Sequence, residues 1–160
     1  MVSIRLRRLV VLLASSVFCL GTLLAPASAS AQAIRTQAVD DAPLFINLTS
    51  DDPWKVAMAA FFGTNFALKQ GHKPVVIFVN VQATSLFTKS KSTIRAEQFG
   101  RSVHEMYKEF QAAGGRILIC PVCMKASSIA ESDLIDGAEV ATAKTVNDVL
   151  FRPETKTLAW

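Results

Sequence analysis

The stretch KPVVIFVNV, residues 73–81, is an almost unbroken run of Val, Ile and Phe. Such a run lacks the alternation of a half-exposed strand and is typical of a strand buried on both faces of a parallel sheet. Four shorter runs of similar character lie before and after it. They are LFINL (44–48), RILIC (116–120), GAEVAT (137–142) and TKTLAW (155–160). The sequence therefore predicts a sheet of about five strands.

Segments with helical spacing alternate with these strands. Residues 51–71 begin with Asp51 or Asp52 as N-cap and Pro53 at the first helical position, and they end at Gly71. Residues 96–115 and 143–152 are the other two long helical segments. Residues 82–95 are rich in hydroxyl and basic side chains, so we expect an exposed loop there. This alternation predicts an α/β domain with a mainly parallel sheet and helices on both faces.

The first 31 residues have the composition of a secretory signal peptide. Three arginines are followed by an uncharged apolar stretch (9–25) and then by small residues, with cleavage expected near residues 29–33. An uncleaved membrane anchor is the alternative. We expect residues 32–42 to be a disordered lead-in and residues 43–160 to be the domain, exported to the periplasm or secreted, with no stable membrane span after cleavage.

Cleavage also changes the charge of the chain. It removes Arg5, Arg7 and Arg8 and no acidic residue, so 17 basic side chains become 14 against 13 acidic ones. The formal net charge then falls from +4 to +1, which gives no indication of nucleic-acid binding. Only Cys120 and Cys123 remain of the three cysteines.

The Cys120–Cys123 pair directly follows a predicted strand. Structural zinc needs four ligands, and His72 and His104 lack the required spacing, so we expect no metal within one subunit. A disulfide across two residues would close too small a loop to act as a structural staple. Two buried small hydrophobic side chains remain an alternative. Redox or sulfur chemistry is favoured, because Cys120 is a plausible N-cap before Pro121, and free amides there stabilise a thiolate.

Other polar side chains are expected at the same edge of the sheet, where sites lie in such folds. Asn47, Thr49 and Ser50 end the first strand, Asn80 and Gln82 end the second, and Lys125 could place a positive charge near the thiols. Each also has an ordinary structural explanation. Two further groups are left open in the same way: Lys89, Lys91 and Arg95 as an anion site or a solvated loop, and Trp54, Phe61, Phe62 and Phe66 as core or oligomer surface.

The order and spacing of LFINLTSDD, GHKPVVIFVNVQA, AAGGRILICPVC and ESDLIDGAEV resemble the DsrE/DsrF/TusD-like sulfur-relay family over residues 43–160. The resemblance implies a flavodoxin-like three-layer domain, assembly into trimers or hexamers, and no cofactor. It also implies a persulfide on the cysteine after the third strand, which is Cys120 here. The second thiol, Cys123, and the export signal depart from the cytoplasmic relay proteins, so a role in tRNA thiolation is not carried over.

Three functions are therefore expected in order of preference. The first is an exported sulfur-relay protein that carries sulfane sulfur on Cys120, with Cys123 as resolving thiol, and exchanges sulfur with donor and acceptor proteins or small sulfur compounds. The second is a periplasmic thiol–disulfide oxidoreductase. The third is a non-catalytic oligomeric protein that binds a small ligand. Whether the protein is an enzyme stays open.

Overall fold

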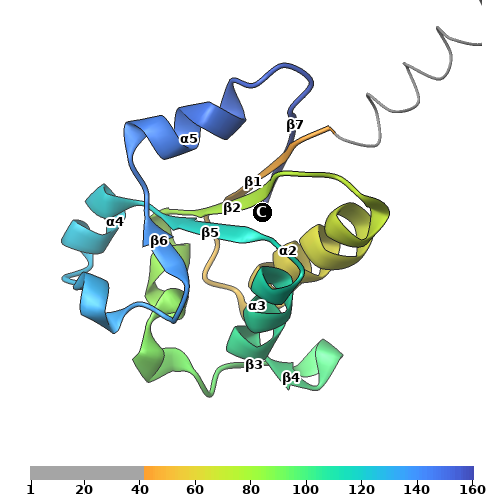
Figure 1. Cartoon of the computed structure of the whole chain (residues 1–160). Coiled ribbons are helices and arrows are strands. Elements are labelled where there is room, and N and C mark those ends of the chain that lie inside the picture. The colour runs from red at the N-terminus through yellow and green to blue at the C-terminus, as the bar shows by residue number, and fades with distance from the viewer. Residues whose placement is uncertain (1–41) are drawn as a thin grey trace, which may run out of the picture. The chain divides into compact units, whose positions relative to one another are not determined.

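The computed structural model describes residues 42–160, so the predicted signal peptide and almost all of the predicted lead-in lie outside the described residues. The described chain contains a sheet of five parallel strands in the order β6-β5-β2-β1-β7 (Figure 1). This confirms the predicted sheet, and the run at 73–81 supplies its central strand. The strands are β1 (Leu44–Leu48), β2 (Val75–Val79), β5 (Arg116–Ile119), β6 (Ala138–Val140) and β7 (Lys156–Ala159).

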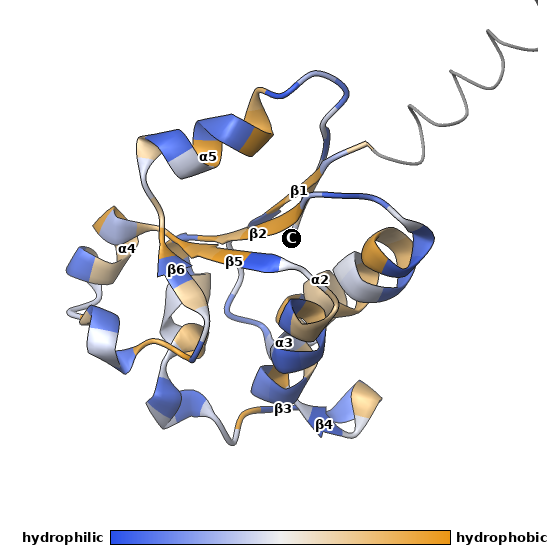
Figure 2. Ribbon diagram, viewed as in Figure 1, coloured by the Kyte–Doolittle hydropathy of each residue, from blue (hydrophilic) through white to orange (hydrophobic). Residues whose placement is uncertain are grey.

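Helices cover both faces of this sheet, as predicted. α2 (Pro53–Phe62) and α3 (Val103–Ala112) lie on one face, and α5 (Ala143–Leu150) lies on the other (Figure 1). Along β2, Ile77 belongs to the core cluster with α2 and α3, whereas Val76 belongs to the cluster with α5. Both faces of the strand are therefore buried, which explains its unbroken apolar sequence (Figure 2).

The helical segment after β1 follows the predicted course with one irregularity. The Asp52 side chain accepts the Trp54 N–H over 2.9 Å and begins α2. The helix continues through a π-helical turn, η1 (Gly63–Ala67), and a 3-10 turn, η2 (Leu68–Gln70), and it ends at Gly71 with φ 98°. A Cβ on Gly63 would lie 2.8 Å from the Phe110 ring, so glycine permits the close approach of this segment to α3.

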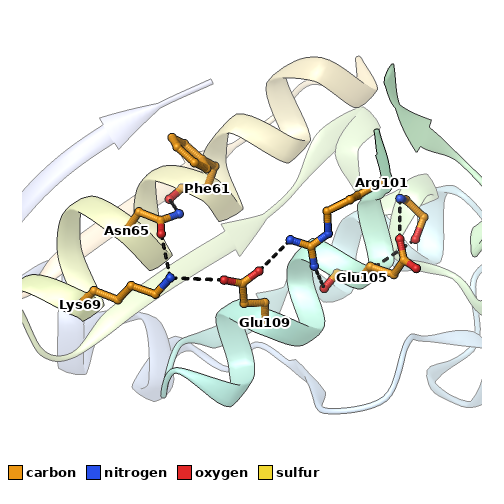
Figure 3. A network of polar contacts seen from close by, with 7 residues as sticks. Phe61, Asn65, Lys69, Arg101, Glu105 and Glu109 are labelled. Atoms are coloured by element: carbon orange, nitrogen blue, oxygen red, sulfur yellow. Dashed lines mark hydrogen bonds and ion pairs between the residues drawn. The ribbon is translucent and has the colours of Figure 1, made fainter. Parts of the chain in front are cut away.

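A polar network fastens the same segment to α3 on the outer surface (Figure 3). Lys69 Nζ donates to Asn65 Oδ1 over 2.8 Å and lies 3.4 Å from Glu109 Oε1. The other carboxylate oxygen of Glu109 lies 2.8 Å from Arg101 Nη1. These groups are partly exposed, so the ion pairs of the network contribute little to the free energy of unfolding.

The prediction of an exposed loop over residues 82–95 is wrong for residues 83–88, most of which are buried, whereas residues 89–93 and Arg95 are exposed as predicted. Most of its first half forms η3 (Val81–Phe87), in which Ala83, Thr84, Leu86 and Phe87 are buried. The Phe87 ring meets the Tyr107 ring edge-on at 4.6 Å between centroids. Hydroxyl groups here bond locally, as when Ser85 Oγ donates to the Gln82 carbonyl, so a polar composition coexists with burial.

The single helix predicted over residues 96–115 is also wrong in its first part. A short hairpin, β3 (Arg95–Ala96) and β4 (Arg101–Ser102), precedes α3, with η5 (Glu97–Phe99) between its strands. Gly100 turns this connection with φ 61°. Ser102 and Glu105 then form a capping box that begins α3 at Val103. The Ser-x-x-Glu spacing was the overlooked signal of that start.

Candidate functional site

Cys120 lies at the carboxyl edge of the sheet, directly after β5. Its backbone is extended (φ −64°, ψ 115°) and it is the N-cap of α4 (Pro121–Ala126), with Pro121 at the first helical position. The Cys120 Sγ accepts the main-chain N–H of Cys123 over 3.3 Å. The predicted N-cap position of this cysteine is therefore confirmed.

The two thiols lie against each other. The Cys123 thiol donates to the Cys120 Sγ with 2.6 Å between the sulfurs, and both cysteines are free and half-buried. Burial and the hydrogen bond to Cys120 raise the pKa of the Cys123 thiol, and this pKa rise is only partly offset by the Val81 N–H. Cys123 therefore favours the protonated form, in which it can donate to Cys120.

Val81 contributes a backbone donor to this site. Its N–H donates to the Cys123 Sγ over 3.1 Å, so three groups form a chain from Val81 through Cys123 to Cys120. Val81 has φ 51°, in the left-handed region that β-branched residues rarely adopt. Strained backbone of this kind is concentrated at functional sites. The prediction named its neighbours Asn80 and Gln82 but missed Val81. Its contact uses a main-chain N–H, which nearly every residue type has, so the identity of the residue does not indicate it.

The structure brings together two of the predicted polar residues. Asn80 Nδ2 donates to Asn47 Oδ1 over 2.6 Å, across the ends of the adjacent parallel strands β2 and β1. Asn80 is buried and Asn47 is half-buried. Their contact holds together the edge of the sheet from which the Val81 segment departs.

The remaining predicted residues have other contacts. Thr49 Oγ1 donates to the Trp160 carbonyl over 2.9 Å, and Ser50 Oγ accepts the Asp52 N–H over 3.1 Å. Lys125 is exposed, and within residues 42–160 it has no hydrogen bond or ion pair to either cysteine. Arg95 lies 3.7 Å from Glu97 in the β3–β4 hairpin.

Within residues 42–160, no group of three or more His, Cys, Asp or Glu side chains is arranged to hold a metal ion. In the same part of the chain, no helix combines the length and apolar character that a membrane span requires.

The model of the DsrE/DsrF-like family matches residues 49–152. The chain belongs to the DsrE/DsrF-like family. The matched region of this DsrE/DsrF-like protein contains Cys120, Cys123, Asn80 and Val81, while β1 and β7 lie outside it. No match was found among curated proteins.

Solved structures share the fold of this DsrE/DsrF-like chain. The YchN protein from E. coli is 12% identical with a TM-score of 0.61, covering 75% of this chain and 99% of YchN. The protein of unknown function MTH1491 from Methanobacterium thermoautotrophicum is 16% identical with a TM-score of 0.55, covering 75% of this chain and 100% of that one. At these identities the likeness establishes the flavodoxin-like α/β fold.

Proposed function

We propose that this protein is an exported sulfur-relay protein that carries sulfane sulfur as a persulfide on Cys120. Family membership supports a role of the sulfur-relay kind. The observation that carries the proposal is the pair of donors directed at one sulfur: the N–H and the thiol of Cys123 both donate to the Cys120 Sγ. Donors of this kind stabilise a thiolate, which is the nucleophilic form of cysteine.

The loading step conserves atoms and electrons. The Cys120 thiolate attacks the outer sulfur of a persulfide or of thiosulfate. A new sulfur–sulfur bond forms on Cys120, and the donor's own sulfur–sulfur bond breaks. The leaving group departs as a thiolate or as sulfite, and no external oxidant or reductant is needed.

Cys123 is proposed as the resolving thiol. After losing its proton, Cys123 attacks the Cys120 Sγ, a Cys120–Cys123 disulfide forms, and hydrosulfide leaves. The sulfane sulfur gains two electrons in this step and the two cysteines supply them. A dithiol reductant, a small molecule or a protein, then restores the pair. In the alternative route, the sulfane sulfur passes directly from Cys120 to an acceptor thiol, and no Cys120–Cys123 disulfide forms.

The structure also favours a second candidate, a thiol–disulfide oxidoreductase. The placement of Cys120 and Cys123 side by side at the start of α4 supports this candidate, because a second thiol can attack a mixed disulfide formed on the first. Such a protein would exchange electrons with partner thiols without gaining sulfur. Activity in an insulin-reduction assay, together with no sulfur adduct from any donor, would select this candidate.

Self-association into a trimer or hexamer is part of the proposal. Aromatic rings along α2 and η1 remain partly exposed, with Trp54 39% and Phe66 57% accessible. These two rings contact Phe61, Phe62 and Phe99 in stacked and edge-on pairs, and Phe61 also lies against Phe99 in a tilted pair. Light scattering behind size-exclusion chromatography measures the oligomer, and a monomer at all concentrations would contradict this part.

Intact mass measurement tests the proposed chemistry. Reduced protein lacking residues 1–31 is incubated with polysulfide or thiosulfate and weighed. We expect the added mass of one sulfur atom in Cys123→Ser, where the persulfide cannot be resolved, and none in Cys120→Ser. In the unaltered protein the adduct is replaced by the Cys120–Cys123 disulfide as Cys123 releases the sulfur. Failure of every donor to add sulfur to Cys123→Ser would reject the proposal. Fractionation of cells that make the full chain tests export, which is expected to place the protein outside the cytoplasm.

A further inference from the structure

An open cleft of about 350 Å³ lies between η3 and η4 on one side and the segment after α4 on the other. One wall carries Ser85 of η3 and both lysines of η4 (Lys89–Lys91). The other wall carries Ser127, Ser132 and Asp133, the last two from η6 (Glu131–Asp133). The sulfur-transfer steps described above make no use of this cleft.

Several hydrogen-bond donors in the cleft have no partner. Within residues 42–160, the Lys91 ammonium and the hydroxyls of Ser127 and Ser132 make no hydrogen bond or ion pair. Lys89 already has two partners, because its Nζ donates to the Ser132 carbonyl over 2.9 Å and lies 3.9 Å from Asp136. A lysine ammonium has three donor hydrogens, so Lys89 also retains capacity for a ligand.

The acceptors in the cleft are fewer. Asp133 is the acidic side chain of the lining, and its Oδ2 already accepts the Ala130 N–H over 3.0 Å. Thr88 and Ser90 share a hydrogen bond of 3.0 Å between their hydroxyls. Lys89 and Lys91 therefore face Asp133 in the lining, with Asp136 3.9 Å from Lys89. Within the described part of the chain, the Lys91 ammonium and the hydroxyls of Ser127 and Ser132 remain as unpaired donors, which favour an anion with several oxygen atoms.

The cleft and the dithiol are built from the same two elements. η3 begins at Val81, whose N–H contacts Cys123, and reaches the cleft at Ser85. α4 packs against η3, and Ser127 follows Cys123 by one turn, with its N–H donating to the Cys123 carbonyl. The six residues of α4 lie between Cys120 and Ser127, which are therefore about 10 Å apart along the helix axis.

We propose that the cleft binds the oxyanion group of the sulfur donor. This inference rests on the proposed sulfur-relay function. The oxyanion belongs either to thiosulfate or to a carboxylate of a small peptide persulfide. A tripeptide spans about 10 Å when extended, so a donor of that size reaches from the cleft to Cys120 with its sulfur. Thiosulfate is shorter and would occupy the cleft before moving to the thiol.

Binding is measured on protein with Cys120→Ser and Cys123→Ser, in which no sulfur can be transferred. The probes are sodium thiosulfate and, separately, S-methylglutathione, followed through the amide signals in ¹⁵N–¹H NMR spectra. We expect saturable shifts at the cleft residues with at least one probe. The probe that saturates identifies the donor as inorganic or peptide-like.

Three substitutions in this background sharpen the test. Lys91→Ala removes a charged donor and is expected to weaken binding about tenfold. Asp133→Asn keeps an oxygen for the Ala130 N–H but removes the negative charge, so it is expected to tighten binding. Lys108→Ala is the matched control, because Lys108 is an exposed lysine of α3 outside the cleft.

The outcomes separate this inference from the proposed function. The proposal that the cleft binds an oxyanion is rejected if neither probe gives a saturable shift. It is also rejected if Lys91→Ala and Lys108→Ala weaken binding equally. Both results count even where the unaltered protein forms a persulfide. Saturable binding that depends on Lys91, combined with no persulfide on Cys120, rejects the sulfur-relay role and leaves the cleft as an anion site only.

Discussion

The main-chain N–H of Val81 donates to the Sγ of Cys123 over 3.1 Å, across 42 residues of sequence. The contact joins the turn after β2 to the first turn of α4. It requires Val81 to hold φ 51°, an unfavourable angle for a β-branched residue.

Val81→Gly is expected to stabilise the protein. Glycine adopts the left-handed conformation without steric cost and keeps the N–H that contacts Cys123. Strain of about 1–3 kcal/mol is relieved, and the greater freedom of glycine in the unfolded chain offsets about 0.5–1 kcal/mol of it. Urea unfolding should therefore show a gain of about 1 kcal/mol.

Val122→Gly is the matched control for this prediction. Val122 is also exposed, but it lies in α4, where glycine is a poor helix former. The same substitution should there lower the free energy of unfolding by about 0.5 kcal/mol. Loss of stability at both positions would contradict the account of strain at Val81.

Cys123 is expected to react more slowly than Cys120 with iodoacetamide near neutral pH. Burial, and then the hydrogen bond to Cys120, raise its pKa above the ordinary value for a thiol. The Cys123 rate should keep rising with pH beyond the ordinary thiol pKa of about 8.5. Mass spectrometry of peptides after brief labelling at several pH values gives the two rates, and equal labelling at neutral pH would contradict the expected order.

The same pKa rise has a defined effect on stability. Because the folded protein favours neutral Cys123, its contribution is fully present below the pKa of the unfolded thiol. The contribution is lost as pH increases through the higher pKa of the folded state. Cys123→Ser should remove this part of the pH dependence of unfolding.

The sequence predicted the parts of the site that depend on residue type. Val, Ile and Phe in unbroken runs identified the central strands, and a cysteine between β5 and Pro121 identified an N-cap. Both depend on local preferences that are readable without the fold. The Val81 contact was missed because it depends on a backbone angle and on a donor that every residue except proline possesses.

The errors between residues 82 and 102 have a similar physical origin. Hydroxyl and basic side chains suggested exposure, but Leu86 and Phe87 are buried by the tertiary position of η3. The apolar spacing through Phe99 suggested one helix, but Gly100 turns the chain and Ser102 restarts it. Periodicity alone did not reveal that break, whereas the capping-box spacing could have done so.

Thr84→Val is expected to stabilise the protein by about 1 kcal/mol. The Thr84 side chain is fully buried in η3, and its Oγ1 has no hydrogen-bond partner within the described residues. Valine has nearly the same shape and removes the unsatisfied hydroxyl.

Urea unfolding is the measurement, with Tyr107→Phe as the control. The Tyr107 hydroxyl does donate to the Val56 carbonyl over 3.0 Å, so its removal should instead cost about 1 kcal/mol. A loss with Thr84→Val would indicate a partner for its hydroxyl.

The pair of Arg116 and Glu139 predicts a dependence of stability on acid. The two side chains form hydrogen bonds of 3.0 and 2.7 Å across the neighbouring strands β5 and β6. The hydrogen bond from Arg116 lowers the pKa of Glu139, against a smaller opposing effect of burial. A carboxylate whose pKa falls on folding stabilises the protein above the unfolded value of about 4.3, and the contribution is lost as pH falls through the lower folded pKa.

Glu139→Gln should therefore lower the free energy of unfolding at pH 7 by about 0.5 kcal/mol, since both side chains are partly exposed and screened by solvent. The difference from the unaltered protein should shrink toward zero as pH falls below the folded pKa of Glu139. Glu131→Gln is the control, because Glu131 is exposed and has no ion pair within residues 42–160. Unfolding curves in urea at pH 7 and at pH values below 4.3 measure both variants. If the difference in the free energy of unfolding stays constant across this pH range, the stabilisation by the Arg116–Glu139 pair does not depend on the charge of Glu139.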